Sequence, residues 1–234
     1  MKIYIIPSGW DKELVIKTVF KSGADKVCLV SSYPKKSHVY SQADQITRKL
    51  NVQLVDEISK FTDVDTLEVN YIDFKDIVIQ VNDYIKRNSE NDFVINISTG
   101  SHMIAASLML VAHMNQIETE YSVAQSHNPK IMELVENGEG YHTGFSEILK
   151  IPLLPISFRF TPKEKSLLNE LKRKKVLSVG EFIGEAKGNM ENRKRSEFHY
   201  ICKKLEKQGL AKITSKGKKI EAKLTQLGEI FVEA

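Results

Sequence analysis

The segment that decides the fold is Asp92–Ala112, DFVINISTGSHMIAASLMLVA. Its first part, Phe93–Ile97, is short, apolar and rich in β-branched residues, which predicts a strand buried on both faces of a parallel sheet. Ser98–Ser101 (STGS) follows, and an apolar helix then begins. Small residues between a strand and a helix leave backbone N–H groups free at the positive end of the helix dipole. This arrangement binds anions, most often phosphate. The alternative is a helix cap without a ligand, because Ser and Thr are common caps.

Strands and helices alternate on both sides of this segment. Helices capped by Asp11 and Asp73 separate several of the strands. Further strands are predicted at Lys2–Ile6, Lys26–Ser31, Val52–Val55 and Glu118–Val123, with a short extended piece at Leu67–Tyr71 and an added edge strand at Ile131–Val135. Because parallel neighbours need crossover helices, this order predicts an α/β fold with a Rossmann-like, mostly parallel sheet over residues 1–150.

Polar loops follow three of the predicted strands. They are Ser8-Gly9-Trp10, Ser31–Lys36 and Ser98–His102. The carboxyl ends of parallel strands meet at one edge, where open α/β sheets bind ligands, so we expect a binding site there. No G-x-G-x-x-G follows the first strand, which disfavours a dinucleotide-binding dehydrogenase, and no P-loop motif is present.

Composition excludes several further classes of protein. The 234 residues contain two cysteines, Cys28 and Cys202, which lie in different predicted elements. No spacing of Cys or His fits a metal site, so we expect free thiols, no metal and a cytoplasmic location. The longest apolar run is too short to cross a bilayer, and the N-terminus is a predicted strand rather than a signal peptide. No membrane role is therefore expected.

Charge is distributed unevenly along the chain. From residue 156 on there are 19 Lys and Arg against 10 Asp and Glu, and the preceding residues carry 15 against 20. The front is therefore acidic, at about −5, and the tail basic, at about +9. A basic module on an acidic body indicates that the tail binds a polyanion. The alternative is a solvated basic face.

The tail has the order of elements of a winged helix-turn-helix. Residues 151–160 begin IPLLP and form a predicted linker, because two prolines exclude a helix. Thr161 and Ser178 begin two helices, and a third spans about Glu191–Gln208. A basic hairpin follows, with strands at Leu210–Thr214 and Ile220–Leu224, and then a last helix. Three helices before a hairpin predict a winged helix-turn-helix DNA-binding domain over residues 161–234.

The third helix of this domain is the predicted DNA reader. Phe198, Ile201, Cys202 and Leu205 form its buried stripe. The polar groups that remain suit base edges and phosphates, as do lysines at the tip of the hairpin. The predicted DNA-binding residues are Asn192, Arg193, Arg195, Ser196, His199, Tyr200, Lys203, Lys216, Lys218 and Lys219. The alternative is a winged helix that contacts only proteins.

With both halves placed, the chain resembles the CARF (CRISPR-associated Rossmann fold) regulators, in particular archaeal proteins that join this domain to a winged helix. The resemblance lies in the PSGW turn at Pro7–Trp10 and in NISTGSH at Asn96–His102. The C-terminal pieces KKLEKQGL and LTQLG are similar too, although such sequences are common in winged helices. The resemblance implies a CRISPR-linked antiviral homodimer whose sensor domains bind a cyclic oligoadenylate across the two-fold axis.

Carried over by position, the resemblance implies the ligand-binding residues Ser8, Gly9, Trp10, Ser98, Thr99, Gly100, Ser101 and His102. The expected ligand is cyclic tetra-adenylate, and no cofactor is implied. Relatives often carry Lys or Arg where this chain has His102, and a neutral His attracts phosphate less strongly. Lys35 or Lys36 is a candidate to supply the missing charge.

These observations favour a ligand-responsive transcription regulator that binds double-stranded DNA. One alternative is a ring nuclease, in which Ser98, Thr99 or His102 stabilises the transition state while the ring is cleaved. No paired acid and base is evident, so no catalytic residue is assigned. The other alternative is a DNA-binding regulator that senses a different nucleotide or anion.

Overall fold

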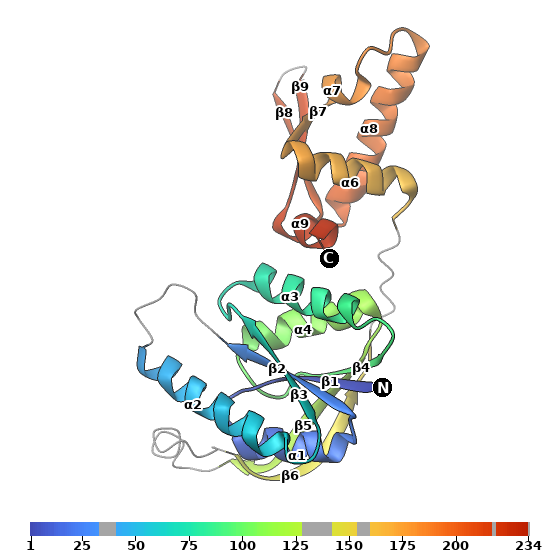
Figure 1. The fold of residues 1–234 in the computed structure, drawn as a ribbon. Helices are drawn as coiled ribbons and strands as arrows, with labels where there is room; N and C mark the ends of the chain where they lie inside the picture. The colour runs from blue at the N-terminus through green and yellow to red at the C-terminus, as the bar shows by residue number, and fades with distance from the viewer. Residues whose placement is uncertain (33–40, 128–141, 154–159, 217–218, 234) are drawn as a thin grey trace. The chain divides into compact units, whose positions relative to one another are not determined.

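The computed structural model describes residues 1–32, 41–127, 142–153, 160–216 and 219–233. The chain divides into two compact units, Met1–Ser157 and Phe158–Ala234. The elements of each unit are drawn in Figure 1.

The first unit is built on a six-stranded sheet in the order β3-β2-β1-β4-β5-β6. Five strands are mutually parallel, and β6 runs antiparallel to β5. Their bounds are β1 Lys2–Pro7, β2 Lys26–Ser32, β3 Asp63–Val69, β4 Asp92–Asn96, β5 Glu118–His127 and β6 His142–Ile151. The predicted α/β class with a mostly parallel sheet is therefore confirmed.

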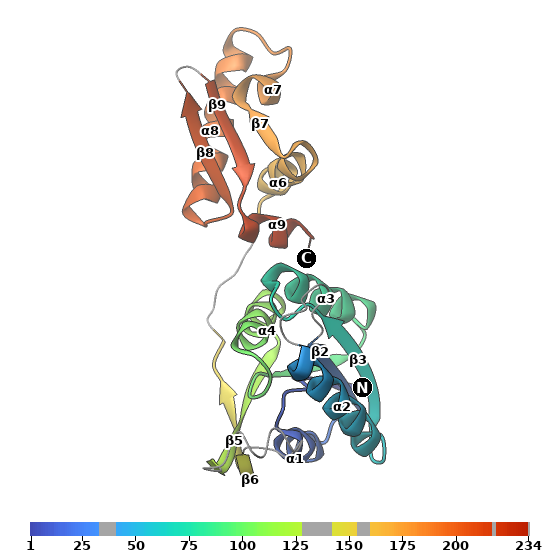
Figure 2. The same cartoon turned by 90° about the vertical axis from the view of Figure 1, so that its left-hand side faces the viewer.

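Helices cover both faces of this sheet. Helices α1 (Lys12–Ser22) and α2 (Ser41–Ile58) lie on one face, and α3 (Phe74–Arg87) and α4 (His102–Asn115) on the other (Figures 1 and 2). The central strands are buried on both faces, as the apolar sequence of β1 and β4 requires. Asp11 and Asp73 cap α1 and α3 as predicted, each accepting a hydrogen bond from the backbone N–H three residues on.

One predicted strand of the first unit is wrong, one extended piece is longer than predicted, and one predicted strand lies outside the described residues. Val52–Val55 is not a strand but part of α2, where Leu50, Leu54 and Ile58 are buried at four-residue spacing. Val52 is 66% exposed, so it lies on the outer face of the helix. The third parallel strand is β3, which begins before the extended piece predicted at Leu67–Tyr71. The edge strand predicted at Ile131–Val135 lies outside the described residues.

In its described residues, the second unit combines four helices with a three-stranded sheet in the order β7-β9-β8 (Figure 2). The helices are α6 Pro162–Lys174, α7 Val179–Ile183, α8 Asn189–Lys207 and α9 Gln226–Glu233. The strands are β7 Val176–Ser178, β8 Ala211–Lys216 and β9 Lys219–Leu224. Strand β7 was not predicted. The helix predicted to begin at Ser178 is α7, which ends at Ile183, and Gly184 after it takes a positive φ of 61°.

The core of the second unit is the apolar stripe read from the sequence. Phe198, Ile201, Cys202 and Leu205 of α8 are buried against the leucines of α6 and against β7 and β9. Thr161 and Ser178 each close a capping box with the Glu three residues later, as their spacing predicts. In the described part of the chain, no helix is both long and apolar enough to cross a membrane.

Candidate functional site

Two of the predicted ligand loops follow β1 and β4, the neighbouring strands between which the strand order of the sheet reverses. The sheet grows from β1 toward β2 and β3 on one side, and from β4 toward β5 on the other. β1 and β4 are hydrogen-bonded neighbours, with Ile5 opposite Ile95. Sheets of this kind leave a crevice at the carboxyl ends of such a strand pair, because the two following helices cover opposite faces. The loops after β1 and β4 lie at this edge.

These two loops are in direct contact. A Cβ on Gly9 would lie 2.8 Å from the backbone nitrogen of Gly100 and 2.9 Å from Cβ of Thr99. A Cβ on Gly100 would lie 2.7 Å from Cβ of Pro7. Both glycines have positive φ, 40° and 81°, which other residues adopt at a cost. Thr99 ties the loops further, because its Oγ1 donates to the backbone oxygen of Pro7 over 2.6 Å. Glycine is therefore required at both positions for two reasons. A Cβ would collide with the facing segment, and the positive φ disfavours other residues.

The loop after β4 opens directly into α4. Ser101 caps this helix by accepting a hydrogen bond from the backbone nitrogen of Ile104 at 3.2 Å. The N–H groups of His102 and Met103 lie in the first turn, where a helix has no acceptor of its own. They have no backbone acceptor elsewhere in the residues that the structure describes. Gly100 and His102 are exposed, so an anion could reach these N–H groups.

A buried hydrogen-bond network supports the loop from beneath. Asn96, at the end of β4, is fully buried and donates from Nδ2 to the hydroxyls of Tyr4 and Ser122, each at 3.0 Å. Tyr4 in turn donates to Oε2 of Glu120 over 2.6 Å. Burial, and then Glu120, raise the pKa of Tyr4 far above its ordinary value. Sequence reasoning missed this network, and the only signal was the polar groups of Tyr4 and Asn96 within the largely apolar strands β1 and β4.

The remaining predicted ligand residues are placed differently. Ser8 is buried, and its backbone nitrogen donates to the oxygen of Val30, so it is part of the sheet edge. Trp10 is 36% exposed, and its ring nitrogen donates to Oγ1 of Thr47 at 2.8 Å. Trp10 therefore fastens the first loop to α2. The third predicted loop, Ser31–Lys36, does not begin at Ser31, because Ser31 and Ser32 still belong to β2. Its remainder, with Lys35 and Lys36, lies outside the described residues.

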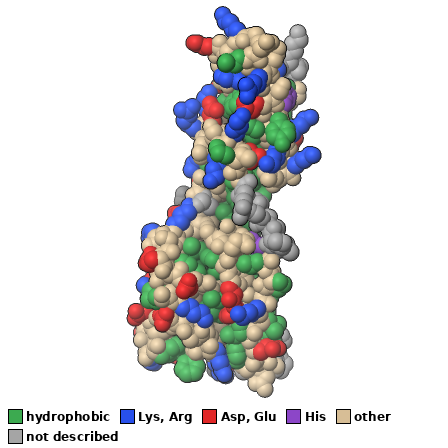
Figure 3. All heavy atoms as spheres, turned by 90° about the vertical axis from the view of Figure 1, so that its right-hand side faces the viewer, with side chains coloured by type: hydrophobic (Ala, Val, Ile, Leu, Met, Phe, Trp, Pro, Cys, Tyr) green, Lys and Arg blue, Asp and Glu red, His purple; other side chains and the backbone are tan. Residues whose placement is uncertain are grey.

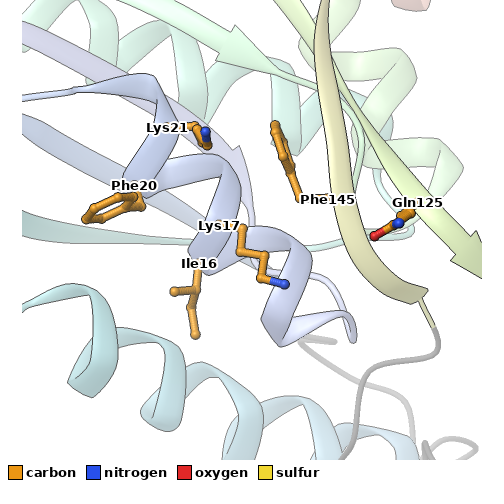
Figure 4. Close-up of a pocket in the computed structure, with 6 residues that line it drawn as sticks. All are labelled: Ile16, Lys17, Phe20, Lys21, Gln125 and Phe145. Carbon is orange, nitrogen blue, oxygen red and sulfur yellow. The ribbon is translucent and has the colours of Figure 1, made fainter.

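One pocket lies away from this edge. It has a volume of about 370 Å³ and is lined by α1, β5 and β6 (Figure 4), through Ile16, Lys17, Phe20, Lys21, Gln125 and Phe145. None of the predicted ligand residues lines it. Across the described residues, no group of three or more His, Cys, Asp or Glu is placed to hold a metal ion.

Most residues predicted to bind DNA lie on the outer face of α8. Asn192, Arg193, Arg195, Ser196 and Lys203 are exposed, and Tyr200 is 71% exposed, whereas His199 is half-buried. On the face drawn in Figure 3, many Lys and Arg side chains lie over this unit with some acidic side chains among them, and both signs of charge are also mixed over the first unit. Lys216 and Lys219 are backbone partners across the β8–β9 hairpin, and Lys218 lies outside the described residues.

Ion pairs fix the orientation of α8 and of one of its cations. Nζ of Lys204 contacts the buried carboxylate of Glu164 at 2.5 Å, which joins α8 to the start of α6. Burial opposes ionisation of Glu164, but hydrogen bonds from Lys204 and Thr161 outweigh it and lower the pKa of this carboxyl. On the outer face, Arg195 contacts Glu191 one turn earlier at 3.1 Å.

Comparison with known proteins gives one family match. The family model described as "HFX_2341_N:-like, N-terminal" matches residues 2–128, more than half of the chain. No curated protein matches.

Many solved structures are similar in part, and three of them are described here. Csm6 from Enterococcus italicus, bound to cyclic hexa-2′-fluoro-hexa-dAMP, is 13% identical with a TM-score of 0.41, over 90% of this chain and 56% of that one. Can2 from Sulfobacillus thermosulfidooxidans, in complex with cyclic tetra-adenylate, is 10% identical with a TM-score of 0.42, over 99% and 61%. Protein VC1899 from Vibrio cholerae is 11% identical with a TM-score of 0.39, over 100% and 64%. The chain thus spans less than two thirds of each structure, and scores at this level do not establish a common fold.

Proposed function

Because this chain belongs to the HFX_2341_N:-like, N-terminal family over residues 2–128, we propose that this unit is the sensor of a two-part regulator. The sensor binds a cyclic oligoadenylate, and the second unit binds double-stranded DNA as a winged helix-turn-helix. The sequence resemblance to CARF regulators supports the same reading. In this proposal the ligand changes how strongly, or at what spacing, two copies of the second unit hold DNA.

The observation that carries the sensor half is the contact between the loops after β1 and β4. Gly9 packs on Gly100 at the reversal point of the sheet, so two loops and a helix N-terminus meet at one place. Free N–H groups and the helix dipole there favour a phosphate, whereas the unit as a whole is acidic. Recognition therefore depends on groups that act at contact distance rather than on net charge. Within the class, we propose cyclic tetra-adenylate.

The DNA-binding half is supported by charge and by the exposed face of α8. Helix α8 follows two helices and precedes the β8–β9 hairpin, which is the order of a winged helix. It leaves Asn192, Arg193 and Arg195 exposed near its N-terminal end, where a recognition helix reaches base edges. The excess of Lys and Arg in this unit suits the phosphate backbone.

A homodimer is supported by the surface of α4. Met103 is 41% exposed, Ala106 is exposed and Leu110 is half-buried, so an apolar stripe with helical spacing remains uncovered on this helix. The stripe begins beside the exposed His102. We propose that a second copy covers it, which would place two copies of the ligand loops next to each other.

The sensor proposal is tested by titrating purified protein with cyclic tetra-adenylate, cyclic hexa-adenylate and AMP. At 100 times its dissociation constant, a specific ring should stabilise the protein by about 2.7 kcal/mol, visible as a higher melting temperature. AMP is the control for non-specific nucleotide binding. Equal melting temperatures with every compound would refute a cyclic oligoadenylate sensor.

The DNA proposal is tested with a labelled duplex from the protein's own promoter region, over a range of salt concentrations. Arg195→Ala should weaken binding and reduce the salt slope by about 1, because one phosphate or base contact is lost. Arg173→Ala is the matched control, since Arg173 is an exposed cation on α6 that the proposal does not use. Equal losses in both variants would show that only overall charge matters.

A further inference from the structure

The orientation of the Asn96 side chain is determined by its neighbours. The backbone N–H of Ser98 lies 3.0 Å from Oδ1 of Asn96, and a backbone N–H can only donate. The reversed amide would place two donors face to face. Both hydrogens of Nδ2 are used, one on the Tyr4 hydroxyl and one on the Ser122 hydroxyl. Oδ1 is therefore an acceptor that faces Ser98, and Asn96 has no hydrogen left to give.

This orientation decides where the Ser98 hydroxyl points its proton. Oγ of Ser98 also contacts Oδ1 of Asn96. Because Oδ1 can only accept, the Ser98 proton lies on this contact and points into the protein. A hydroxyl has a single proton and two lone pairs, so half-buried Ser98 presents only lone pairs toward the outside. Its outward face accepts hydrogen bonds and donates none.

The hydroxyl of the next residue, Thr99, also donates its proton to an internal acceptor. Oγ1 of Thr99 donates to the backbone oxygen of Pro7, and Thr99 is only 6% exposed. Neither hydroxyl can therefore donate to a phosphate oxygen, or to a negative charge that develops during cleavage, without breaking an internal hydrogen bond. The N–H groups at the start of α4 remain among the donors available to an anion in this loop.

We infer that Ser98 recognises the ribose of the bound ring, by accepting a hydrogen bond from a 2′-hydroxyl. This inference rests on the proposed function and assigns a separate part of the ligand to each group. The N–H groups of His102 and Met103 donate to phosphate oxygens, and Ser98 accepts a hydrogen bond from the neighbouring ribose 2′-hydroxyl. In a nucleotide the 2′-hydroxyl is adjacent to the carbon that carries the 3′-phosphate, whereas the adenine amino group lies at the far side of the base. An acceptor a few residues from a phosphate site therefore suits the 2′-hydroxyl.

The inference predicts selection for ribose over rings that lack this donor. The probes are cyclic tetra-adenylate and its 2′-fluoro counterpart, because fluorine keeps a ribose-like sugar shape but cannot donate. Wild-type protein should bind the 2′-fluoro ring about tenfold more weakly, the size of one net hydrogen bond. Ser98→Ala should bind both rings equally, and Ser98→Thr, which keeps the hydroxyl, should restore the preference. The salt dependence of binding should be the same in all three proteins, since the phosphate contacts are unchanged.

The outcomes separate this inference from the proposed function. If wild-type protein binds both rings equally well, the assignment of Ser98 is wrong while the sensor proposal stands. A ribose preference that persists in Ser98→Ala also overturns it. If neither ring binds wild-type protein, the proposed function fails and the assignment fails with it. The comparison of two rings on wild-type protein needs no variant to fold, so the inference can be refuted in every case.

Discussion

Replacing Gly100 with alanine should separate the two ligand loops. Gly100 has a φ of 81°, a conformation that costs an L-residue about 1–2 kcal/mol. Its new Cβ would lie 2.7 Å from Cβ of Pro7, and such overpacking costs about 1–3 kcal/mol. Alanine also lowers the conformational entropy of the unfolded chain, and this raises the free energy of unfolding by about 0.4–1 kcal/mol. We therefore expect Gly100→Ala to lower the free energy of unfolding of the first unit by about 2–4 kcal/mol.

The matched control is Gly23→Ala. Gly23 also has a positive φ, 59°, but a Cβ there meets nothing within 4 Å. This variant carries the conformational cost without the clash, so we expect a loss of about 1 kcal/mol or less. The difference between the two variants, about 2 kcal/mol, measures the contact between the loops.

Trp10 makes the assay specific for this unit. It is the only tryptophan of the chain and lies in the loop after β1, with its ring nitrogen bonded to Thr47. Its fluorescence during urea unfolding therefore reports on the first unit alone. In a unit of this size, 1 kcal/mol corresponds to about 2–4 °C, so a loss of about 2–4 kcal/mol should lower the melting temperature of Gly100→Ala by about 4–16 °C relative to wild type. If Gly100→Ala and Gly23→Ala differ by less than about 0.5 kcal/mol, the loops do not press on each other and the reasoning is wrong.

Three further predictions concern other contacts. Thr99→Val should destabilise the first unit by about 1 kcal/mol, because Pro7 loses its hydrogen bond, while Thr99→Ser should not; equal melting of the two variants would contradict this. The pKa of Glu164 is lowered in the folded protein, so its stabilisation is complete above its ordinary value of 4.5 and is lost as pH falls further. Glu164→Gln should therefore be less stable than wild type at pH 7, with a gap that narrows in acid, and a gap independent of pH would refute the ion pair. Burial raises the pKa of both Cys28 and Cys202 to about 12, so neither thiol should react with Ellman's reagent at pH 8 until the protein unfolds, and rapid reaction of folded protein would show an open thiol.

Local patterns were sufficient for most elements of the chain. The apolar run before Ser98, the caps at Asp11, Asp73 and Thr161, and the stripe through Phe198 each depend on residues within about two turns of one another. The assignment failed at Val52–Val55, because a short apolar stretch fits a strand and a helix equally well. The longer spacing of Leu50, Leu54 and Ile58 favours the helix.

By itself, the sequence determined that this protein has an α/β unit with Gly-bearing loops after its strands, followed by a basic helical unit with a hairpin. It also located the helix that begins after Ser101, since a cap is a local signal. Only the tertiary structure decided that β1 and β4 are neighbours, that Gly9 touches Gly100, and that Asn96 turns the Ser98 proton inward. Pairing between residues some ninety positions apart is decided by how strands and helices pack together, and no short-range pattern encodes which hydroxyl will donate and which will accept.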